Sequence, residues 1–400
     1  MTPVGNTVAE TWDAVVNGKN GIDYITQFDV SKMKVRIGGE VKNLDIGKYL
    51  ELREARRLDR AGIFALIAAT QAYEDAGLEG ADIDRDRFGV FVTSGIGGIQ
   101  TINVESRKSH ENGPDRVSPF FVPNAIINLI GGHIAIKYKV HGPNLPVVTA
   151  CSSGTNSIGE AFRYIRDGYL DIAFGGGTEA PINELGVGGF TAMRALNMSN
   201  DPENACMPFD RRRSGFVIAE GAGVLMLEEL EHAKKRGAPI YAELVGYGST
   251  CDAYHITAPD ETAEGITKAI KLALLDAGVN AEAIDHINAH GTSTPYNDRL
   301  ETLAIKKALG EHAYKVNISS TKSMMGHSLG ATGAIETIMT VKAITDGICP
   351  PTINYQEYDP ECDLNYTPNM AVRRVVDYAI NINVGFGGQN AVLILKKYEN

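Results

Sequence analysis

The sequence predicts an α/β protein, in which short buried strands alternate with amphipathic helices. Short apolar runs recur along the chain, and several end directly in glycines, as at 175–177. Segments with apolar residues at helical spacing follow most of these runs. Glycine is abundant, at 43 residues, which suits a fold with many tight turns between strands and helices. These three observations define the fold class.

The composition narrows the class of protein. The chain has 400 residues, 44% of them hydrophobic, enough for two or three domains or one large duplicated unit. A net charge of −11 argues against nucleic-acid binding. No apolar run reaches the roughly 18 residues of a membrane helix, and no signal-peptide pattern opens the chain. Five irregularly spaced cysteines argue against disulfides and a metal site, so we expect a reduced, cytoplasmic protein.

The first half is predicted to begin with a turn and a helix. Thr7 and Glu10 form a capping-box pattern at the start of that helix. Further helices are predicted at 58–76, 158–165 and 228–236, and strands at 88–93, 146–150 and 171–180, with two strands or a strand pair joined by E-G-A-G within 216–228. The glycine turn at 94–99 lacks dinucleotide-binding spacing and is interpreted as an ordinary tight turn.

The second half repeats the same alternation after Gly237 and Pro239. Strands are predicted at 240–245, 284–288, 316–320 and 381–390, and helices at 269–276, 301–309 and 334–344. The repetition indicates a duplication, with an N-terminal half at 1–238 and a C-terminal half at 239–400. No low-complexity linker separates the halves, so we expect one compact body.

The stretch V-V-T-A-C-S-S-G-T-N-S, residues 147–157, places Cys151 where a buried strand gives way to a helix. Small residues keep this turn tight and leave helix N–H groups unpaired. The positive end of the helix dipole stabilises a thiolate, so the pattern predicts a lowered pKa and a nucleophilic role for Cys151. A small core cysteine fits the same stretch equally well.

Two other loops that follow strands carry reactive side chains, namely His290 in one loop and Lys322 with His327 in the other. Ligands bind beyond the carboxyl ends of strands in open α/β sheets, so these residues are expected to share a site with Cys151. The other histidines are interpreted as structural or surface residues: His110, His133, His141, His232, His255, His286 and His312. On these residues alone, a protease, a glutaminase and a thioester acyltransferase all remain open.

Four motifs in order resemble those of the elongating β-ketoacyl-acyl-carrier-protein synthases. They are T-A-C-S-S-G at 149–154, N-A-H-G-T-S-T-P at 288–295, K-S-M-M-G-H-S-L-G-A-T-G-A-I-E at 322–336 and G-F-G-G at 385–388. The match covers nearly the whole chain, and G-Y-G-S-T-C-D-A-Y-H-I-T-A-P at 246–259 resembles the type II branch. The resemblance implies a thiolase-like fold, with two duplicated α/β halves in five layers, and a homodimer.

The resemblance also implies an acyltransferase reaction that needs no cofactor. An acyl chain on acyl carrier protein is condensed with malonyl-acyl-carrier protein, with loss of carbon dioxide, in fatty acid elongation. Cys151 would hold the acyl group, while His290 and His327 would bind the malonyl thioester carbonyl and stabilise the enolate. The backbone N–H groups of Cys151 and Phe386 would form the oxyanion hole, and the Phe386 ring would act as a gate.

Supporting residues follow from the same resemblance. Lys322 resembles a family lysine that pairs with a glutamate 14 positions later, here Glu336, and would organise the histidines electrostatically. Thr292 and Thr294 would hydrogen-bond the phosphopantetheine arm. The acidic carrier needs a basic docking patch, for which the candidates are Arg56, Arg57, Arg194 and the run 211–213. Solvated surface charge or internal ion pairing would explain the same arginines.

The chain departs from the family pattern in two places. Family members begin with a strand before the first turn, whereas this chain starts at the turn. We expect the missing strand to be an interior one, so that each buried orphan group costs about 1–3 kcal/mol. Other residue types are usual at four positions around the site, and these are expected to shift chain-length preference or rate: Val384, Gln389, Met325 and Ser328.

Three alternatives to an elongating synthase follow from these motifs. A non-catalytic partner subunit, like the chain-length factors of polyketide systems, would lack the nucleophile, whereas Cys151 is present. A polyketide-type ketosynthase would use the same mechanism on other substrates. An inactive, N-terminally truncated paralogue would keep the motifs and lose the stability to use them.

Overall fold

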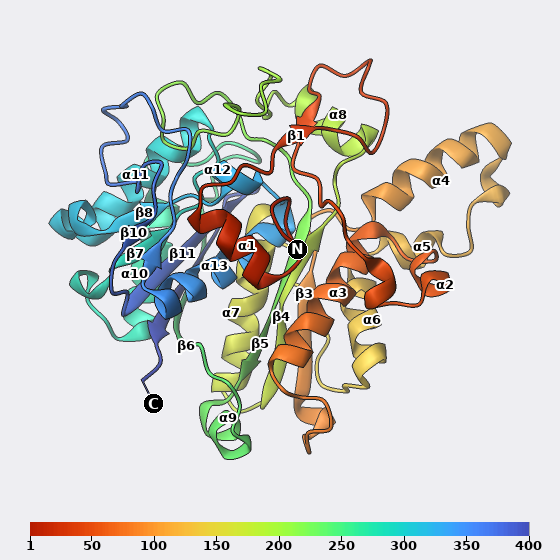
Figure 1. The fold of residues 1–400 in the computed structure, drawn as a ribbon, viewed down its shortest axis with the longest axis horizontal. Helices are drawn as coiled ribbons and strands as arrows, with labels where there is room; N and C mark the ends of the chain where they lie inside the picture. Colours follow the sequence, from red (N-terminus) through yellow and green to blue (C-terminus); the bar gives the residue numbers. More distant parts are fainter. Residues whose placement is uncertain (400) are drawn as a thin grey trace.

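A computed structural model describes residues 1–399 as two large β-sheets, with helices between them and on both outer faces, and two small two-stranded sheets (Figure 1). The first sheet has the strand order β3-β4-β5, and the second has the order β6-β12-β11-β7-β8. Their bounds are β3 Phe88–Thr93, β4 Ile172–Glu179, β5 Gly221–Glu228, β6 Ala242–Cys251, β7 His286–Asn288, β8 Asn317–Ser319, β11 Tyr378–Gly385 and β12 Gln389–Lys397.

Two helices lie between the sheets and pack against both, namely α7 (Ser153–Arg166) and α13 (Thr332–Asp346). Helices α3 (Arg60–Asp75) and α6 (Asn128–Tyr138) cover the outer face of the first sheet. Helices α10 (Glu264–Ala277) and α11 (Pro295–Leu309) cover the outer face of the second. The alternation of helix and sheet layers confirms the predicted five-layer, thiolase-like arrangement.

The remaining elements are short or lie at the periphery. They are the helices α1 Val8–Val16, α2 Leu52–Ala55, α4 Ile99–Asn112, α5 Phe121–Ala125, α8 Glu184–Ala192, α9 Leu230–Arg236 and α12 Lys322–Met325, and the strands β1 Asp23–Tyr24, β2 Ile37–Gly38, β9 Ile348–Cys349 and β10 Val372–Arg373. No helix within residues 1–399 is long and apolar enough to cross a membrane.

Most predicted elements are present at nearly the predicted bounds. Thr7 caps α1 by accepting the backbone N–H of Glu10, as the capping pattern predicts. The strand expected at 240–245 continues through the glycines to Cys251 as β6, because its whole length pairs with β12. The prediction of two strands within 216–228 is wrong, because only 221–228 pairs with β4, as the single strand β5, and the residues before it make isolated bridges.

The two sheets share one strand pattern, which accords with duplication. In the first sheet β3 pairs parallel with β4, which pairs antiparallel with β5. In the second, β7 pairs parallel with β11, which pairs antiparallel with β12. The central helices meet at their N-terminal turns, where a Cβ on Gly154 would lie 2.9 Å from the Ala334 nitrogen. Glycine therefore lets the starts of α7 and α13 come together.

The expectation of a missing interior strand is wrong. The second-half counterpart of that strand is β6, which lies at the edge of its sheet and pairs only with β12. The equivalent place in the first sheet is the free edge of β5. Met1 occupies the start of that edge, where its backbone exchanges two hydrogen bonds with Ala222. An edge position leaves fewer buried groups unpaired than an interior one.

The predicted buried strand at 146–150 is also wrong. The preceding residues bond to β3 at Val90, through Pro143 O and Leu145 N, but the segment then runs extended without a ladder. Val148 is 48% exposed. The segment follows the bridge to β3 at the edge of the first sheet, and no strand within residues 1–399 pairs with its outer side.

Candidate active site

Cys151 lies in a short 3₁₀ turn, Ala150–Ser152, that leads directly into α7. Ala150 has a φ of 51°, a left-handed conformation that is strained for a residue with a side chain. Backbone strain of this kind is typical of functional turns. The turn is closed by Ser153, whose Oγ accepts the Thr149 N–H at 2.8 Å and donates to Ala150 O at 2.6 Å. The predicted tight turn into a helix, the Cys151 elbow, is present, although no strand of the described chain leads directly into it.

A second set of bonds supports the elbow from the other half of the molecule. Asn156 donates to Thr149 Oγ1 at 2.7 Å, and its side-chain oxygen accepts the Tyr247 hydroxyl at 2.7 Å. Tyr247 belongs to β6, in the second sheet. The strained turn before Cys151 is therefore held by α7 and by the second half together.

The Lys322 charge and two backbone N–H groups, those of Phe386 and Cys151, lower the pKa of the Cys151 thiol. Gly385 brings the Phe386 turn close, because a Cβ at that position would lie 2.4 Å from Thr149 O. Burial is the larger effect and raises the pKa of Cys151 to about 12. The expected lowered pKa is thus outweighed by loss of solvent, and the resting thiol is protonated.

His290 follows β7 and is held through its backbone. Its N–H donates to Glu301 of α11 at 2.6 Å, and its carbonyl accepts the Lys322 ammonium at 2.5 Å. Asn383 of β11 faces its ring, with Nδ2 3.4 Å from Nδ1. Both burial and the Lys322 charge lower the pKa of His290, so its ring is neutral.

His327 comes from the second half but is pinned to the first. Its N–H donates to Val217 O at 2.7 Å, and its carbonyl accepts the Ala219 N–H at 2.9 Å. Its ring stands at 87° to that of His290, with centroids 5.3 Å apart. The Phe216 ring packs on the His327 ring in a T-shaped arrangement, with ring centroids 5.2 Å apart. Phe216 also shares a buried cluster with Cys151. The two predicted histidines therefore lie side by side.

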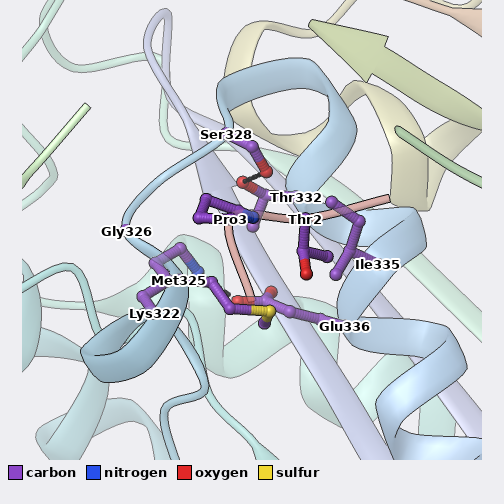
Figure 2. Close-up of a pocket in the computed structure, with 9 residues that line it drawn as sticks. All are labelled: Thr2, Pro3, Lys322, Met325, Gly326, Ser328, Thr332, Ile335 and Glu336. Atoms are coloured by element: carbon purple, nitrogen blue, oxygen red, sulfur yellow. Dashed lines mark hydrogen bonds and ion pairs between the residues drawn. The ribbon is translucent and has the colours of Figure 1, made fainter. Parts of the chain in front are cut away.

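Lys322 and Glu336 form a buried ion pair beneath the histidines. The Lys322 Nζ lies 2.6 Å from Glu336 Oε1, and both residues are 1% exposed. The second Glu336 oxygen accepts from Asn383 Nδ2 at 2.7 Å. Figure 2 shows both residues on one wall of a small cavity. The Lys322 charge acts on the pKa of Cys151, His290 and His327, so all four groups share one electrostatic environment.

The other predicted site residues lie around this centre. Thr292 and Thr294 share a hydrogen bond of 2.9 Å in the loop after His290. Phe386 is half-buried in the turn between β11 and β12, and its ring centroid is 6.4 Å from that of Phe190. The turn is tied down by a bond from Gly387 N to Ile256 O.

The arginine candidates for docking divide into two groups. Arg56, Arg57 and Arg194 are exposed, and no carboxylate within residues 1–399 lies in ion-pairing distance of them. In the run 211–213, Arg213 is buried against Asp359 at 2.5 Å, and Arg212 pairs with Asp210 at 2.8 Å. Internal pairing therefore explains two arginines of that run, which leaves Arg211 exposed.

Two of the unusual positions lie away from the cysteine. Val384 packs on the core of the second half, and Met325 packs in the cluster that joins α1 to α13. Ser328, by contrast, lies beside His327. No group of three or more histidine, cysteine or acidic residues within the described chain is arranged to hold a metal ion.

Sequence reasoning missed Glu301 and Asn383, which support His290 and the ion pair. A signal for Asn383 was present, since Asn381 and Asn383 alternate with apolar residues and so share one face of a strand. Glu301 gave no comparable signal. Its carboxylate is buried and bonds only to nearby N–H groups in the His290 loop and α11.

A cysteine at a helix start and two neutral imidazoles, all three under the charge of one buried lysine, form a set of residues that suits nucleophilic catalysis. The models of the beta-ketoacyl synthase N-terminal and C-terminal domains match residues 1–233 and 241–356. The chain is 49% identical over its full length to 3-oxoacyl-[acyl-carrier-protein] synthase 2 of Synechocystis sp., of which it covers 96%. It is 48% identical to the Staphylococcus aureus (strain N315) protein of the same name, over 100% of this chain and 96% of that protein.

Solved structures give the same result. A beta-ketoacyl synthase from Burkholderia phymatum superposes with a TM-score of 0.93 at 32% identity, over 100% of this chain and 97% of that one. A ketosynthase in complex with its type II polyketide acyl-carrier protein and a bound hexaketide superposes with a TM-score of 0.92 at 35% identity, with the same coverage. The chain belongs to the β-ketoacyl synthase family, whose members are condensing acyltransferases, as the motifs predict.

Proposed function

We propose that this enzyme condenses an acyl chain on acyl carrier protein with malonyl-acyl-carrier protein, releasing carbon dioxide and a 3-oxoacyl product. The observation that carries the proposal is the meeting of Cys151, His290 and His327 around Lys322. Curated relatives at 48–49% identity over their matched length are named 3-oxoacyl-[acyl-carrier-protein] synthase 2, after the product of this reaction.

The first step is transfer of the acyl group to Cys151. The sulfur attacks the thioester carbonyl, the carbonyl oxygen becomes negative, and the departing pantetheine sulfur takes the proton lost by Cys151. The N–H groups of Phe386 and Cys151 lie beside the sulfur and would donate to that oxygen. Such preorganised donors act where charge develops, at no reorganisation cost during the reaction.

In the second step the malonyl group loses carbon dioxide, and the electron pair moves onto its thioester oxygen as an enolate. The two neutral imidazoles would donate to that oxygen. The enolate carbon then attacks the acyl-Cys151 carbonyl and expels the sulfur as a thiolate, which takes up one proton from solvent water. Lys322 holds the His290 carbonyl and keeps positive charge beneath the developing anion. Thr292 and Thr294 would bind the pantetheine arm, and Phe386 would separate the acyl and malonyl sites.

Replacement of either histidine is expected to separate the two steps. In His290→Ala and His327→Ala enzymes, condensation should fall by about 10²–10³-fold, the cost of losing one donor to a developing oxyanion. Acylation of Cys151 should survive, since its donors are backbone N–H groups. Mass spectrometry of the acyl-enzyme and product analysis measure the two steps. His312→Ala, outside the site, is the matched control. Full-rate condensation by either site variant would contradict the assigned roles.

We also propose that the carrier docks beside Arg194 and the pair Arg56 and Arg57. Helix α8 places Phe190 against the Phe386 ring, and Arg194 follows four residues later in an exposed turn. A docked acidic carrier would therefore lie next to the gate. Complementary charge of this kind chiefly raises the association rate.

Charge reversal tests this patch. Arg194→Glu is expected to raise the KM for acyl-carrier substrates about tenfold while kcat is kept, and the difference should shrink as salt screens the charges. Lys235→Glu, on α9 at the opposite end of the molecule, is the matched control (Figure 1). An unchanged KM at low salt rules out the patch.

A homodimer is proposed from the exposed apolar residues of α5, α6 and the unpaired segment beyond β3. These residues are Val122, Ile136, Leu145 and Val148. In a symmetric dimer, segment 145–148 of a second copy would cover the open edge of segment 145–148 in the first copy. Analytical ultracentrifugation should give a particle of twice the chain mass of 43.0 kDa, and Val148→Asp should shift the measured mass toward that of a single chain. A native monomer contradicts the proposal.

Two further proposals concern pathway and compartment. The fatty acid pathway is preferred to a polyketide one because a relative named 3-oxoacyl-[acyl-carrier-protein] synthase 2 is 49% identical to this chain. The ketosynthase bound to a polyketide acyl-carrier protein is 35% identical. Substrate profiling decides between them, and a cooperative melt excludes a degraded paralogue. The cysteines are free thiols, which fits a cytoplasmic location that cell fractionation can check.

A further inference from the structure

His327 belongs to a buried group of hydroxyls. Its Nδ1 lies 2.9 Å from Thr332 Oγ1, and that oxygen lies 3.2 Å from Ser328 Oγ. The three residues are 2%, 2% and 6% exposed. Figure 2 shows the two hydroxyls facing each other at the start of α13, above the Lys322–Glu336 pair.

The ring of His327 has a single proton to place. Burial, together with the Lys322 charge, lowers the pKa of His327 well below its usual range, so the imidazole is neutral. A neutral imidazole donates from one nitrogen and accepts at the other. The direction of the hydrogen bonds through Thr332 therefore decides which nitrogen faces the substrate as a donor.

Only one direction gives every hydroxyl hydrogen an acceptor. If Ser328 donates to Thr332, and Thr332 donates to Nδ1, both hydroxyl hydrogens have acceptors, and the ring proton on Nε2 is left for the substrate. In the reverse direction the Ser328 hydrogen is left facing the cavity that Lys322 lines. Glu336 lines that cavity too, but its oxygens already accept from Lys322 and Asn383. Leaving a buried hydroxyl unpaired is unfavourable, so the first direction prevails.

The cavity favours the same direction. Its wall includes Thr2, Ser328, Thr332 and Lys322. An ammonium group can only donate, so the Lys322 side of the cavity offers the Ser328 hydroxyl a donor and no acceptor. The Ser328 hydrogen therefore turns away from Lys322, which again sends donation through Thr332 toward His327.

We propose that Ser328 and Thr332 form a hydroxyl relay that fixes His327 in the tautomer with its proton on Nε2. The inference rests on the proposed role of His327, because Nε2–H is the donor that the thioester oxygen needs. His290 offers a parallel, since Asn383 Nδ2, oriented by the Glu336 carboxylate, faces its Nδ1. Thr332 and Ser328 are positioning residues that act through His327.

The tautomer can be read directly by ¹⁵N NMR of enzyme labelled in its histidine rings, with the His327 signals assigned by their loss in His327→Gln. The wild type should show a bare Nδ1 and a protonated Nε2. Thr332→Val should shift the tautomer ratio about 5- to 10-fold toward Nδ1–H, and Thr332→Ser should restore it. A wild-type His327 protonated on Nδ1 overturns the proposal.

Kinetics give a second readout. Thr332→Val should lower kcat for condensation about 5- to 10-fold, leave Cys151 acylation unchanged and be rescued by Thr332→Ser. Thr340→Val is the matched control, because this buried threonine of α13 donates only to Glu336 O. Wild-type kcat and tautomer in Thr332→Val refute the relay. A wild type that shows Nε2–H but does not condense would instead refute the proposed function.

Discussion

Replacing Cys151 by alanine is expected to abolish both acyl-enzyme formation and condensation, by about 10⁴-fold or more. The substitution removes the atom that holds the acyl group, and no other thiol shares the N–H groups that face this sulfur. Malonyl decarboxylation should continue slowly, because both histidines and Lys322 remain. Intact-protein mass spectrometry after incubation with acyl-carrier protein measures the first effect.

The matched control is Cys349→Ala. Cys349 is also a fully buried free thiol whose pKa burial raises to about 12, but it lies in a separate cluster of the second half. Its variant should acylate as the native enzyme does. Acylation of the Cys151→Ala enzyme at the native rate would refute the nucleophile.

Breaking the Lys322–Glu336 pair is expected to have the largest effect on stability. Lys322→Met leaves a carboxylate that is 1% exposed without its cation, which costs about 3–5 kcal/mol of unfolding free energy. Condensation should fall as well, since the His290 carbonyl loses its donor. Denaturant unfolding and steady-state kinetics measure these losses.

The double variant Lys322→Met with Glu336→Gln separates charge from packing. A neutral pair of similar volume should recover most of the lost stability, because no charge is left buried alone. Activity should stay low, since the positive charge is absent. Single variants as stable as the native enzyme would contradict a buried ion pair.

The sequence predicted the fold well because its signals are local. Helical spacing located α3 and α13, and glycine-capped apolar runs located β3 and β4. The wrong predictions concern which strands pair with one another in a sheet. The segment 146–150 has a strand-like composition, but whether it pairs depends on what lies beyond β3, which no local pattern contains. The place expected for a strand before the first turn likewise depends on sheet order, and its second-half counterpart β6 lies at a sheet edge.

The site was predicted unevenly for a similar reason. Cys151 precedes a predicted helix, and His290 and His327 follow predicted strands, so these reactive groups can be recognised by type and position. The groups that orient them come from distant elements and have no motif of their own. Tyr247 reaches the elbow from β6, and Val217 and Ala219 fix the His327 backbone from the first half. Such contacts are made by the packing of two halves and are visible only in three dimensions.

The most direct measurement is a crystal structure of the Cys151→Ala enzyme with a non-decarboxylating malonyl thioester analogue. We predict one carbonyl oxygen within hydrogen-bonding distance of Nε2 on both His290 and His327, with the position of the missing sulfur facing the analogue's reactive carbon. A carbonyl bound by neither ring, or rings that contact different ligands, would contradict the account.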